Sequence, residues 1–517
     1  MSEVSATESG SNTEAGTRLQ NFLDRAGLRG FPWKTAIILY TISWGWLFIV
    51  RDSYWADDWI FFPKHANHDW TIQGQAPWIP IGENILFEFF GPMGFRVLTF
   101  IFFFSAGIFF YGILNSLKKF PTLDSGILAL LFLLMPFNTA RVAMMVFHYT
   151  AGNFLFFLAW YLVVCSNLRW SRFLAALAFF LSFQMHSLLF LYALPLINMW
   201  LNSRHSLFNN FRLWLGRNSI FVALPIIYLG LRQIFWPERL FRYHNVSATN
   251  LTSTLPFVFV IFILVLIFLS IRKILPVQKK ISIEIFIAAV CSFFLATWPY
   301  VLLGYFPPSF SILPKYVTTF IGRSDWYSRH LTLQPLAAVL VFAGIMQVFV
   351  RYNRRLMATI LHSLLVLCVF INMFFGFEYF VDYSKQQKVI NSLQAENDLY
   401  EVHDVQFVDQ SRLLNARGRT YRDRDWMGLI WKSYGSSAIT NTIIESSCKT
   451  VSGTSRLVLI QGPETHWRAL KNWVSDGDMG FKVTVDDTPG ACKPVMVKDQ
   501  QSSGAIPILF YFTGAKG

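Results

Sequence analysis

Two adjacent acids stand between tryptophans in the segment "YWADDW", just after the first long apolar run of the chain. An Asp in an aromatic, partly dehydrated setting beside a second Asp has a raised proton affinity. Such a carboxylate can accept a proton from an attacking hydroxyl, so we expect Asp57 or Asp58 to be a catalytic base. Neighbouring helical positions point about 100° apart, and only one of the two would face a substrate. The alternative is a solvated cap at the end of a helix.

The side chains around this acidic pair are candidate substrate contacts. Trp55 and Trp59 frame the acids, although tryptophan at this depth is also an ordinary interfacial anchor. His65 and His68 have the i, i+3 spacing of a zinc pair, but the sequence offers no clear third ligand. We therefore favour polar loop residues, with contacts to sugar hydroxyls as the functional alternative. The sequence supports no metal and no other cofactor.

Basic side chains gather before a late apolar run, in the segment "GRSDWYSRH". Arg323, Arg329 and His330 lie close to Tyr327 there, and Arg141 lies in another polar segment, "FNTARVAMMVFHYTAGN". A guanidinium donates two parallel hydrogen bonds to phosphate. We therefore predict that these bases bind the phosphate group of a lipid-linked sugar donor, and that Tyr327 contacts substrate. The alternative for a boundary Arg is snorkelling to lipid headgroups.

The composition indicates a helical polytopic membrane protein. Of the 517 residues, 54% are hydrophobic, and the mean hydropathy is +0.41. The formal net charge of +14 is best explained by Lys and Arg retained on the cytoplasmic side of a membrane. Nucleic-acid binding would need that charge collected on one soluble domain, and the sequence contains no such domain.

The apolar runs predict about eleven transmembrane helices. The region 172–201 is either one long helix or two short ones, and only two helices leave all basic clusters on the cytoplasmic side. We therefore choose two. The predicted spans are 33–50, 95–117, 122–138, 149–168, 172–184, 188–201, 219–235, 254–271, 282–304, 332–350 and 356–378.

Three regions follow from this topology. Residues 1–32 form a disordered or amphipathic cytoplasmic N-terminus, and 33–380 form the transmembrane region, whose first apolar helix we expect to be retained rather than cleaved. The long external loops are 52–93 and 305–331. Residues 381–517 form a soluble α/β domain on the periplasmic side, about the size that holds its own core.

Local patterns predict the elements outside the spans. "GENILFEFFGPMG" reads as a short interfacial helix that turns Leu86, Phe87, Phe89 and Phe90 toward lipid. The C-terminal domain contains the predicted strands "DVQFVD", "RLVLIQ", "FKVTVD" and "PILFYF", and the predicted helix "ETHWRALKNWVSD". Cys448 and Cys492 would pair if that domain is in an oxidising compartment, and two buried thiols are the alternative.

The layout resembles the multi-spanning glycosyltransferases of the GT-C fold, a class that includes protein O-mannosyltransferases, aminoarabinose transferases and serotype-converting O-antigen glucosyltransferases. The match rests on the many spans and on an acid in the first external loop, here "YWADDW". The resemblance implies that Asp57 or Asp58 is the base. Several members carry a second acid in the next loop, whereas this chain has Arg141, His148 and Tyr149 there, which argues against a two-carboxylate metal site.

These features together lead us to expect a membrane glycosyltransferase of the bacterial inner membrane. It would move a sugar from a polyprenyl-phosphate donor to an O-antigen, lipopolysaccharide or similar periplasmic acceptor, after an upstream sugar-lipid synthase and a flippase. One alternative is a non-catalytic polysaccharide-lipid transporter or assembly protein, although the absence of acids from the middle of the spans argues against ion coupling. Another is an O-antigen polymerase or ligase. We expect no nucleic-acid partner.

Overall fold

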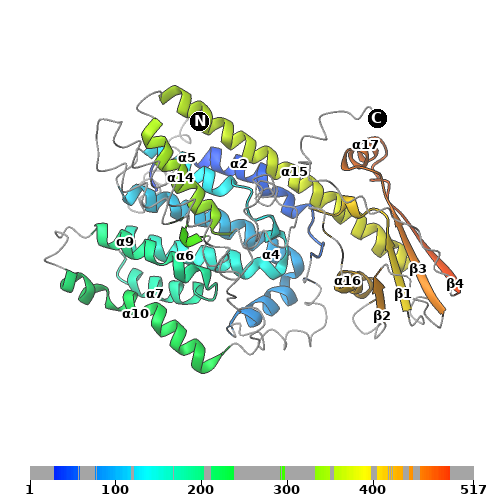
Figure 1. Cartoon of the computed structure of the whole chain (residues 1–517), viewed down its shortest axis with the longest axis horizontal. Coiled ribbons are helices and arrows are strands. Elements are labelled where there is room, and N and C mark those ends of the chain that lie inside the picture. Colours follow the sequence, from blue (N-terminus) through cyan, green and yellow to red (C-terminus); the bar gives the residue numbers. More distant parts are fainter. Residues whose placement is uncertain are drawn as a thin grey trace, which may run out of the picture.

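The structure is a computed structural model, and it is mostly helical (Figure 1). The residues it describes are 28–55, 58, 76, 78–117, 122–166, 168–202, 211–237, 292, 294–296, 332–349, 354–396, 404–416, 419, 421, 423–434, 442–445 and 454–489. Four helical stretches within them are long and apolar enough to cross a membrane, namely Trp78–Ser116, Met144–Cys165, Arg212–Phe235 and Arg355–Ala395. The expected class of helical membrane protein is confirmed at that level.

A helical region precedes a small α/β region along the chain (Figure 1). The α-helices described in the helical region are α2 (Trp33–Trp44), α4 (Trp78–Ser116), α5 (Thr122–Leu134), α6 (Phe147–Cys165), α7 (Ser171–Ser182), α8 (Ser187–Leu191), α9 (Ala193–Asn202), α10 (Phe211–Phe235), α14 (Gln334–Phe349) and α15 (Arg354–Ala395). Short 3-10 helices are η1 (Gly45–Phe48), η3 (Thr139–Val142) and η4 (Met144–Val146). The predicted span 254–271 and most of 282–304 lie outside the described residues.

Helix α4 contains a kink at Gly91 and Pro92 that divides it into two halves. Gly91 has φ +57°, a conformation that favours glycine, and Pro92 cannot donate the helical hydrogen bond. Before the kink, the exposed apolar side chains are Ile81, Ile85, Phe89 and Phe90. Leu86 and Phe87 instead pack against a second hydrophobic core, which includes Tyr54 and Phe95. The exposed face follows an i, i+4, i+8 stripe at helical period rather than a contiguous run.

The stretch 172–201 is broken into separate helices. α7 ends at Ser182 and α8 begins at Ser187, and the turn between them contains Gln184. The Gln184 Oε1 accepts a hydrogen bond from the backbone N of Ala76 at 3.0 Å. The break is therefore held by Ala76 of the first predicted external loop, two residues before α4 begins.

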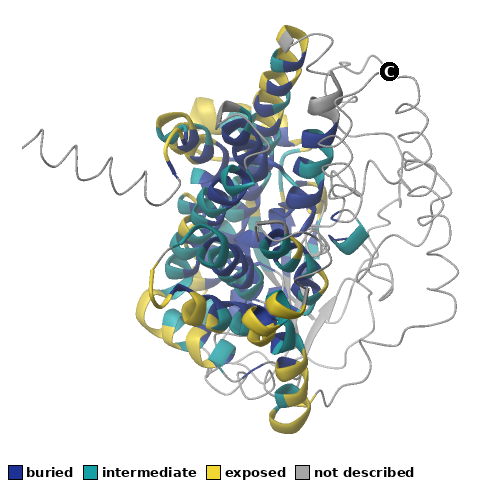
Figure 2. Ribbon diagram, turned by 90° about the vertical axis from the view of Figure 1, so that its left-hand side faces the viewer, coloured by how far each residue is buried: buried dark blue, intermediate teal, exposed yellow. Residues whose placement is uncertain are grey.

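Close aromatic packing holds the helices together, and the buried residues gather inside the helical region (Figure 2). Trp46 of η1 stacks on Tyr379 of α15 with ring centroids 4.9 Å apart. Gly376, one turn earlier on α15, allows this approach, because a Cβ there would lie 2.5 Å from the Trp46 ring. Helix α15 is thereby joined to the first helix of the region.

The described residues of the α/β region form a four-stranded sheet with two helices. Its strands are β1 (Asp404–Asp409), β2 (Thr442–Glu445), β3 (Thr454–Gln461) and β4 (Lys482–Pro489), in the order β2-β1-β3-β4. β1 is parallel to β2 and β3, and β4 is antiparallel to β3. The helices are α16 (Asp423–Tyr434) and α17 (His466–Asp476), with the 3-10 turn η8 (Arg412–Leu414). "DVQFVD" is β1, while "PILFYF" lies outside the described residues.

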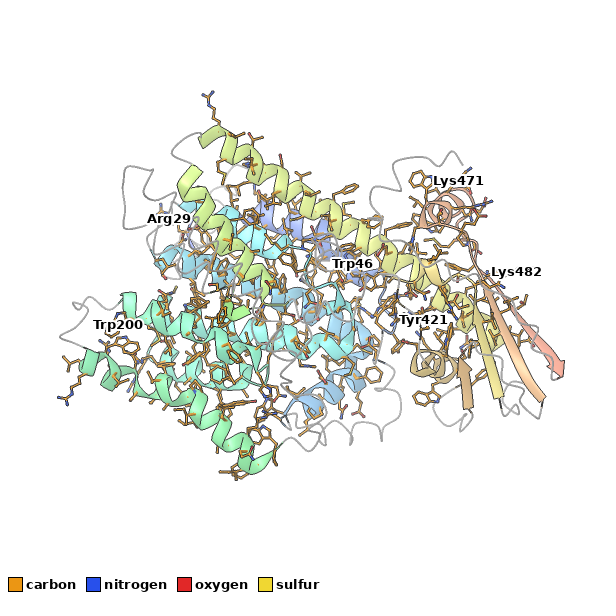
Figure 3. All side chains as sticks on the ribbon, in the orientation of Figure 1. Arg29, Trp46, Trp200, Tyr421, Lys471 and Lys482 are labelled. Carbon is orange, nitrogen blue, oxygen red and sulfur yellow. The ribbon has the colours of Figure 1, made fainter. Side chains whose placement is uncertain are left out.

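A buried polar network fastens this sheet to α15. Lys385 donates to the Asp409 Oδ2 at 2.6 Å and also to Asn415, and its side chain is fully buried. One turn away, Asp382 accepts hydrogen bonds from Tyr421 and from the backbone N of Ala416. Tyr421, labelled in Figure 3, lies where these segments meet. Because α15 runs without interruption from the helical region into this network, it positions the sheet.

Candidate functional site

Asp58 is fully buried near the start of the first predicted external loop, and its carboxylate accepts hydrogen bonds from backbone N–H groups. Oδ2 accepts a hydrogen bond from the N–H of Trp55 at 3.0 Å, and Oδ1 accepts one from the N–H of Met145 at 3.0 Å. Met145 lies in η4, within the polar segment "FNTARVAMMVFHYTAGN" (residues 137–153), which the predicted topology makes the second external segment. Asp58 therefore closes a tight turn and joins the first segment to the second.

Burial raises the pKa of Asp58 to about 7, from an ordinary value of 3.8. Hydrogen bonds from the backbone of Met145, Trp55 and Met144, and the charge of Arg96, act in the opposite direction. The carboxyl group accordingly changes its charge near neutral pH. Because both oxygens already accept backbone hydrogen bonds, this geometry fits a positioning role better than that of an exposed base.

Trp55 is also completely buried, with its ring at the meeting point of loop, α15 and the α/β region. The ring lies edge-on to Tyr379 with centroids 4.9 Å apart, and the guanidinium carbon of Arg419 lies 5.4 Å from its centroid. The neighbouring residue Tyr54 exchanges two backbone hydrogen bonds with the side chain of Gln386, at 3.2 and 3.0 Å. Gln386 and Tyr379 of α15 therefore hold the turn before Asp58 in place.

Arg96, which the sequence analysis did not select, holds the same turn from the α4 side. Its guanidinium donates to the carbonyl of Arg51, and to the carbonyl and hydroxyl oxygens of Ser53 at 2.6 and 3.0 Å. The signal in the sequence is one Arg at the start of an apolar run, four residues after the Pro of a Gly-Pro pair. A buried Arg that satisfies carbonyls is a reason to expect a rigid loop.

Arg141 lies in η3 with its guanidinium enclosed by two aromatic rings. The guanidinium carbon is 3.8 Å from the ring centroid of Trp44 and 3.9 Å from that of Phe103. Nε donates to the carbonyl of Asn138 at 2.7 Å, whereas both terminal nitrogens are buried without a hydrogen-bond partner among the described residues. Burial lowers the pKa of Arg141 to about 10, so it stays charged at neutral pH.

A buried contact between His148 and Glu83 links the first half of α4 to the second segment. The His148 Nδ1 lies 3.5 Å from the Glu83 Oε1, and both side chains are almost entirely enclosed. The second predicted external segment has no acid of its own, and its His148 contacts the Glu83 carboxyl of the first predicted external loop. Two groups do not make a metal centre, and the described residues contain no cluster of three or more metal-binding side chains.

The start of the predicted span 332–350 and helix α15 reach the same place. The Asn138 side chain donates to the Thr332 hydroxyl at 2.8 Å, and Tyr379 donates to the carbonyl of Thr139 at 3.3 Å. In the sequence, Thr332 follows His330 by two positions. The described parts of the first two segments, the start of the predicted span 332–350 and α15 therefore meet around residues 138–148.

Most of the residues selected from the sequence lie outside the described residues. These are Asp57, Trp59, His65, His68, Arg323, Tyr327, Arg329, His330, Cys448 and Cys492. Of the selected set, the structure describes Asp58, Trp55 and Arg141, and all three side chains are buried. Cys165 and Cys368 are free thiols in apolar helices.

The described residues form a helical protein with helices long and apolar enough to cross a membrane, and with an attached α/β region. No family model, curated protein or solved structure significantly matches the chain. Its function therefore has to be argued from its own residues.

Proposed function

We propose that the protein is a membrane glycosyltransferase that moves a sugar from a polyprenyl-phosphate donor to a glycan acceptor at the end of the bundle that carries the sheet. The proposal includes the GT-C-like arrangement of about eleven spans expected from the sequence. Its support is the meeting of the first-loop aspartate, Arg141 and the Asn138–Thr332 contact at one end of the helices. The hydrogen bond from Met145 to Asp58 holds the loop that carries the acidic pair next to the segment that carries Arg141.

The Arg141 guanidinium carries the phosphate part of this proposal. A buried cation with two nitrogens lacking hydrogen-bond partners is costly, and the described residues offer it no carboxylate. A phosphate oxygen would supply both the missing acceptors and the opposite charge. We assign Arg141 to the donor phosphate, together with Arg323, Arg329 and His330 from the third segment.

The aspartate pair divides into two roles in this proposal. Asp58 uses both carboxylate oxygens on backbone N–H groups, so we assign it to positioning the loop. Asp57 is then the base that accepts the proton of the acceptor hydroxyl as that oxygen bonds to the sugar carbon and the donor's phosphate leaves. Trp59, His65, His68 and Tyr327 remain proposed substrate contacts, and Trp55 supports the turn.

Mass spectrometry of the glycans from a strain that lacks the gene tests the reaction class. A transferase predicts a glycan lighter by one sugar, and restoration of the mass by the wild-type gene. Loss of a whole polymer would instead indicate a polymerase or ligase. Accumulation of unchanged lipid-linked sugar on the wrong side of the membrane would indicate a transporter.

A further inference from the structure

Helix α17 presents an apolar face that the rest of the described chain does not cover. Trp467 is 70% exposed and Val474 is 73% exposed, although both belong to a folded α/β region. Leu470 lies between them, and at 100° per residue all three side chains fall within an arc of about 60°. An exposed apolar arc of this kind on a soluble region marks a binding surface.

The opposite flank of α17 packs against α15, which fixes where the exposed arc lies. Ala469 is buried with Val381 of α15 and with Phe481, and Trp473 lies edge-on to Phe380 of α15 with centroids 5.5 Å apart. In Figure 1, α17 is seen nearly end-on, whereas α15 runs across the picture, so the two axes cross steeply. The exposed arc therefore borders the contact with α15.

Helix α15 carries a stripe of exposed apolar side chains that leads directly to this contact. The exposed members are Leu356, Ile360, Val366, Leu367, Phe370 and Met373. Phe377 and Phe380 continue the same stripe at helical spacing, and they pack against the cluster that contains α17. Helix α17 therefore packs across the end of the exposed apolar stripe of α15, the stripe that would contact lipid.

The length of that stripe gives the depth of α17. A hydrocarbon core of about 30 Å corresponds to roughly 20 helical residues, so a core that begins at Leu356 ends near Gly376. Phe380 lies four residues further along α15, which is about 6 Å. That distance is the depth of the headgroup layer, where amphipathic helices lie and where tryptophan is enriched.

We propose that α17 docks on the phospholipid headgroup layer of the leaflet nearest the sheet, with Trp467, Leu470 and Val474 inserted. Lys471 is exposed next to the apolar arc, at the position from which an ammonium group reaches headgroup phosphate (Figure 3). The docked helix is a second membrane anchor for the α/β region, besides α15. It holds the sheet at a fixed height above the bilayer.

Photocrosslinking of the full-length protein in phospholipid nanodiscs tests this surface. Three single variants carry p-benzoylphenylalanine in place of Trp467, Val474 or Ser475, and mass spectrometry identifies the adducts. Ser475 is the matched control, because it is exposed on α17 about 100° away from Val474. Equal elution volumes and melting temperatures verify that the variants fold alike.

The expected result is a lipid adduct at positions 467 and 474 in several-fold greater yield than at 475. Adducts to a second copy of the chain at 467 and 474 would overturn the proposal and make the arc a protein interface. Equal lipid yields at all three positions would also overturn it. The readout is independent of glycosyl transfer, so the result stands apart from the proposed function.

Discussion

The carboxylate of Asp58 accepts the backbone N–H of Met145 at 3.0 Å, across 87 positions of sequence. This hydrogen bond ties the loop after the first helix to the segment that carries Arg141 and His148. Arg96 and Gln386 hold the same loop through its backbone. The loop next to Asp57 is therefore fixed from three directions, as a catalytic loop needs to be.

The pH dependence of stability tests the burial of Asp58. Its pKa is about 7 in the folded chain and 3.8 in the reference state, so the folded protein binds the proton more tightly. The free energy of unfolding contributed by this group is therefore highest below pH 3.8, falls as the pH rises toward about 7, and is constant above that. We expect Asp58→Asn to reduce the loss of melting temperature between about pH 5 and pH 8. An unchanged loss would contradict the buried carboxyl, and Asp52→Asn, at a more exposed site, is the control.

Replacement of Arg141 by Met separates a functional cation from a structural one. Met fills similar space between Trp44 and Phe103 without a buried charge. If the charge is kept for a donor phosphate, Arg141→Met melts no lower than the wild type but loses sugar transfer. A marked drop in melting temperature would show that the two cation–π contacts, worth up to about 2 kcal/mol each when desolvated, are the reason for the charge.

The buried pair Lys385–Asp409 provides a test of how the sheet is attached. Lys385→Met leaves the Asp409 carboxylate buried without its cation, and breaking such a pair costs about 3–5 kcal/mol. The double variant Lys385→Met with Asp409→Asn removes both charges and is expected to recover part of that loss. Protection of the β1 amides against hydrogen exchange measures the loss in the single variant and the recovery in the double variant. Equal protection in the wild type and the Lys385→Met variant would show that the pair does not hold the sheet.

Two glycines form a matched pair for testing the helical packing. A Cβ at Gly376 would lie 2.5 Å from the Trp46 ring, whereas Gly230 of α10 has nothing within 4 Å of the same position. We expect Gly376→Ala to lower the free energy of unfolding by about 1–3 kcal/mol. Gly230→Ala should leave stability unchanged or raise it by up to about 1 kcal/mol, through better helix propensity. The same response from both variants would mean that η1 and α15 do not pack as described.

The sequence predicted elements better than contacts. Long apolar runs define α4, α6, α10 and α15, because burial in lipid needs a continuous apolar surface, and the alternation in "DVQFVD" matches β1. The prediction that Leu86 and Phe87 lie on the outer face is wrong, because at helical period the exposed stripe follows Ile81, Ile85 and Phe89. The fixing of Asp58 could not be predicted, because it depends on a backbone N–H far away in the sequence.

The most direct test of the proposed function is the glycan mass in a deletion strain that expresses Asp57→Asn or Asp58→Asn. Membrane abundance and melting temperature of each variant establish that it inserts and folds. We predict that Asp57→Asn leaves the glycan one sugar lighter, as in the deletion, while Asp58→Asn retains partial transfer because it moves the loop without removing the base. A full-mass glycan from Asp57→Asn would contradict the assignment of the base, and a full-mass glycan from both variants would contradict the mechanism.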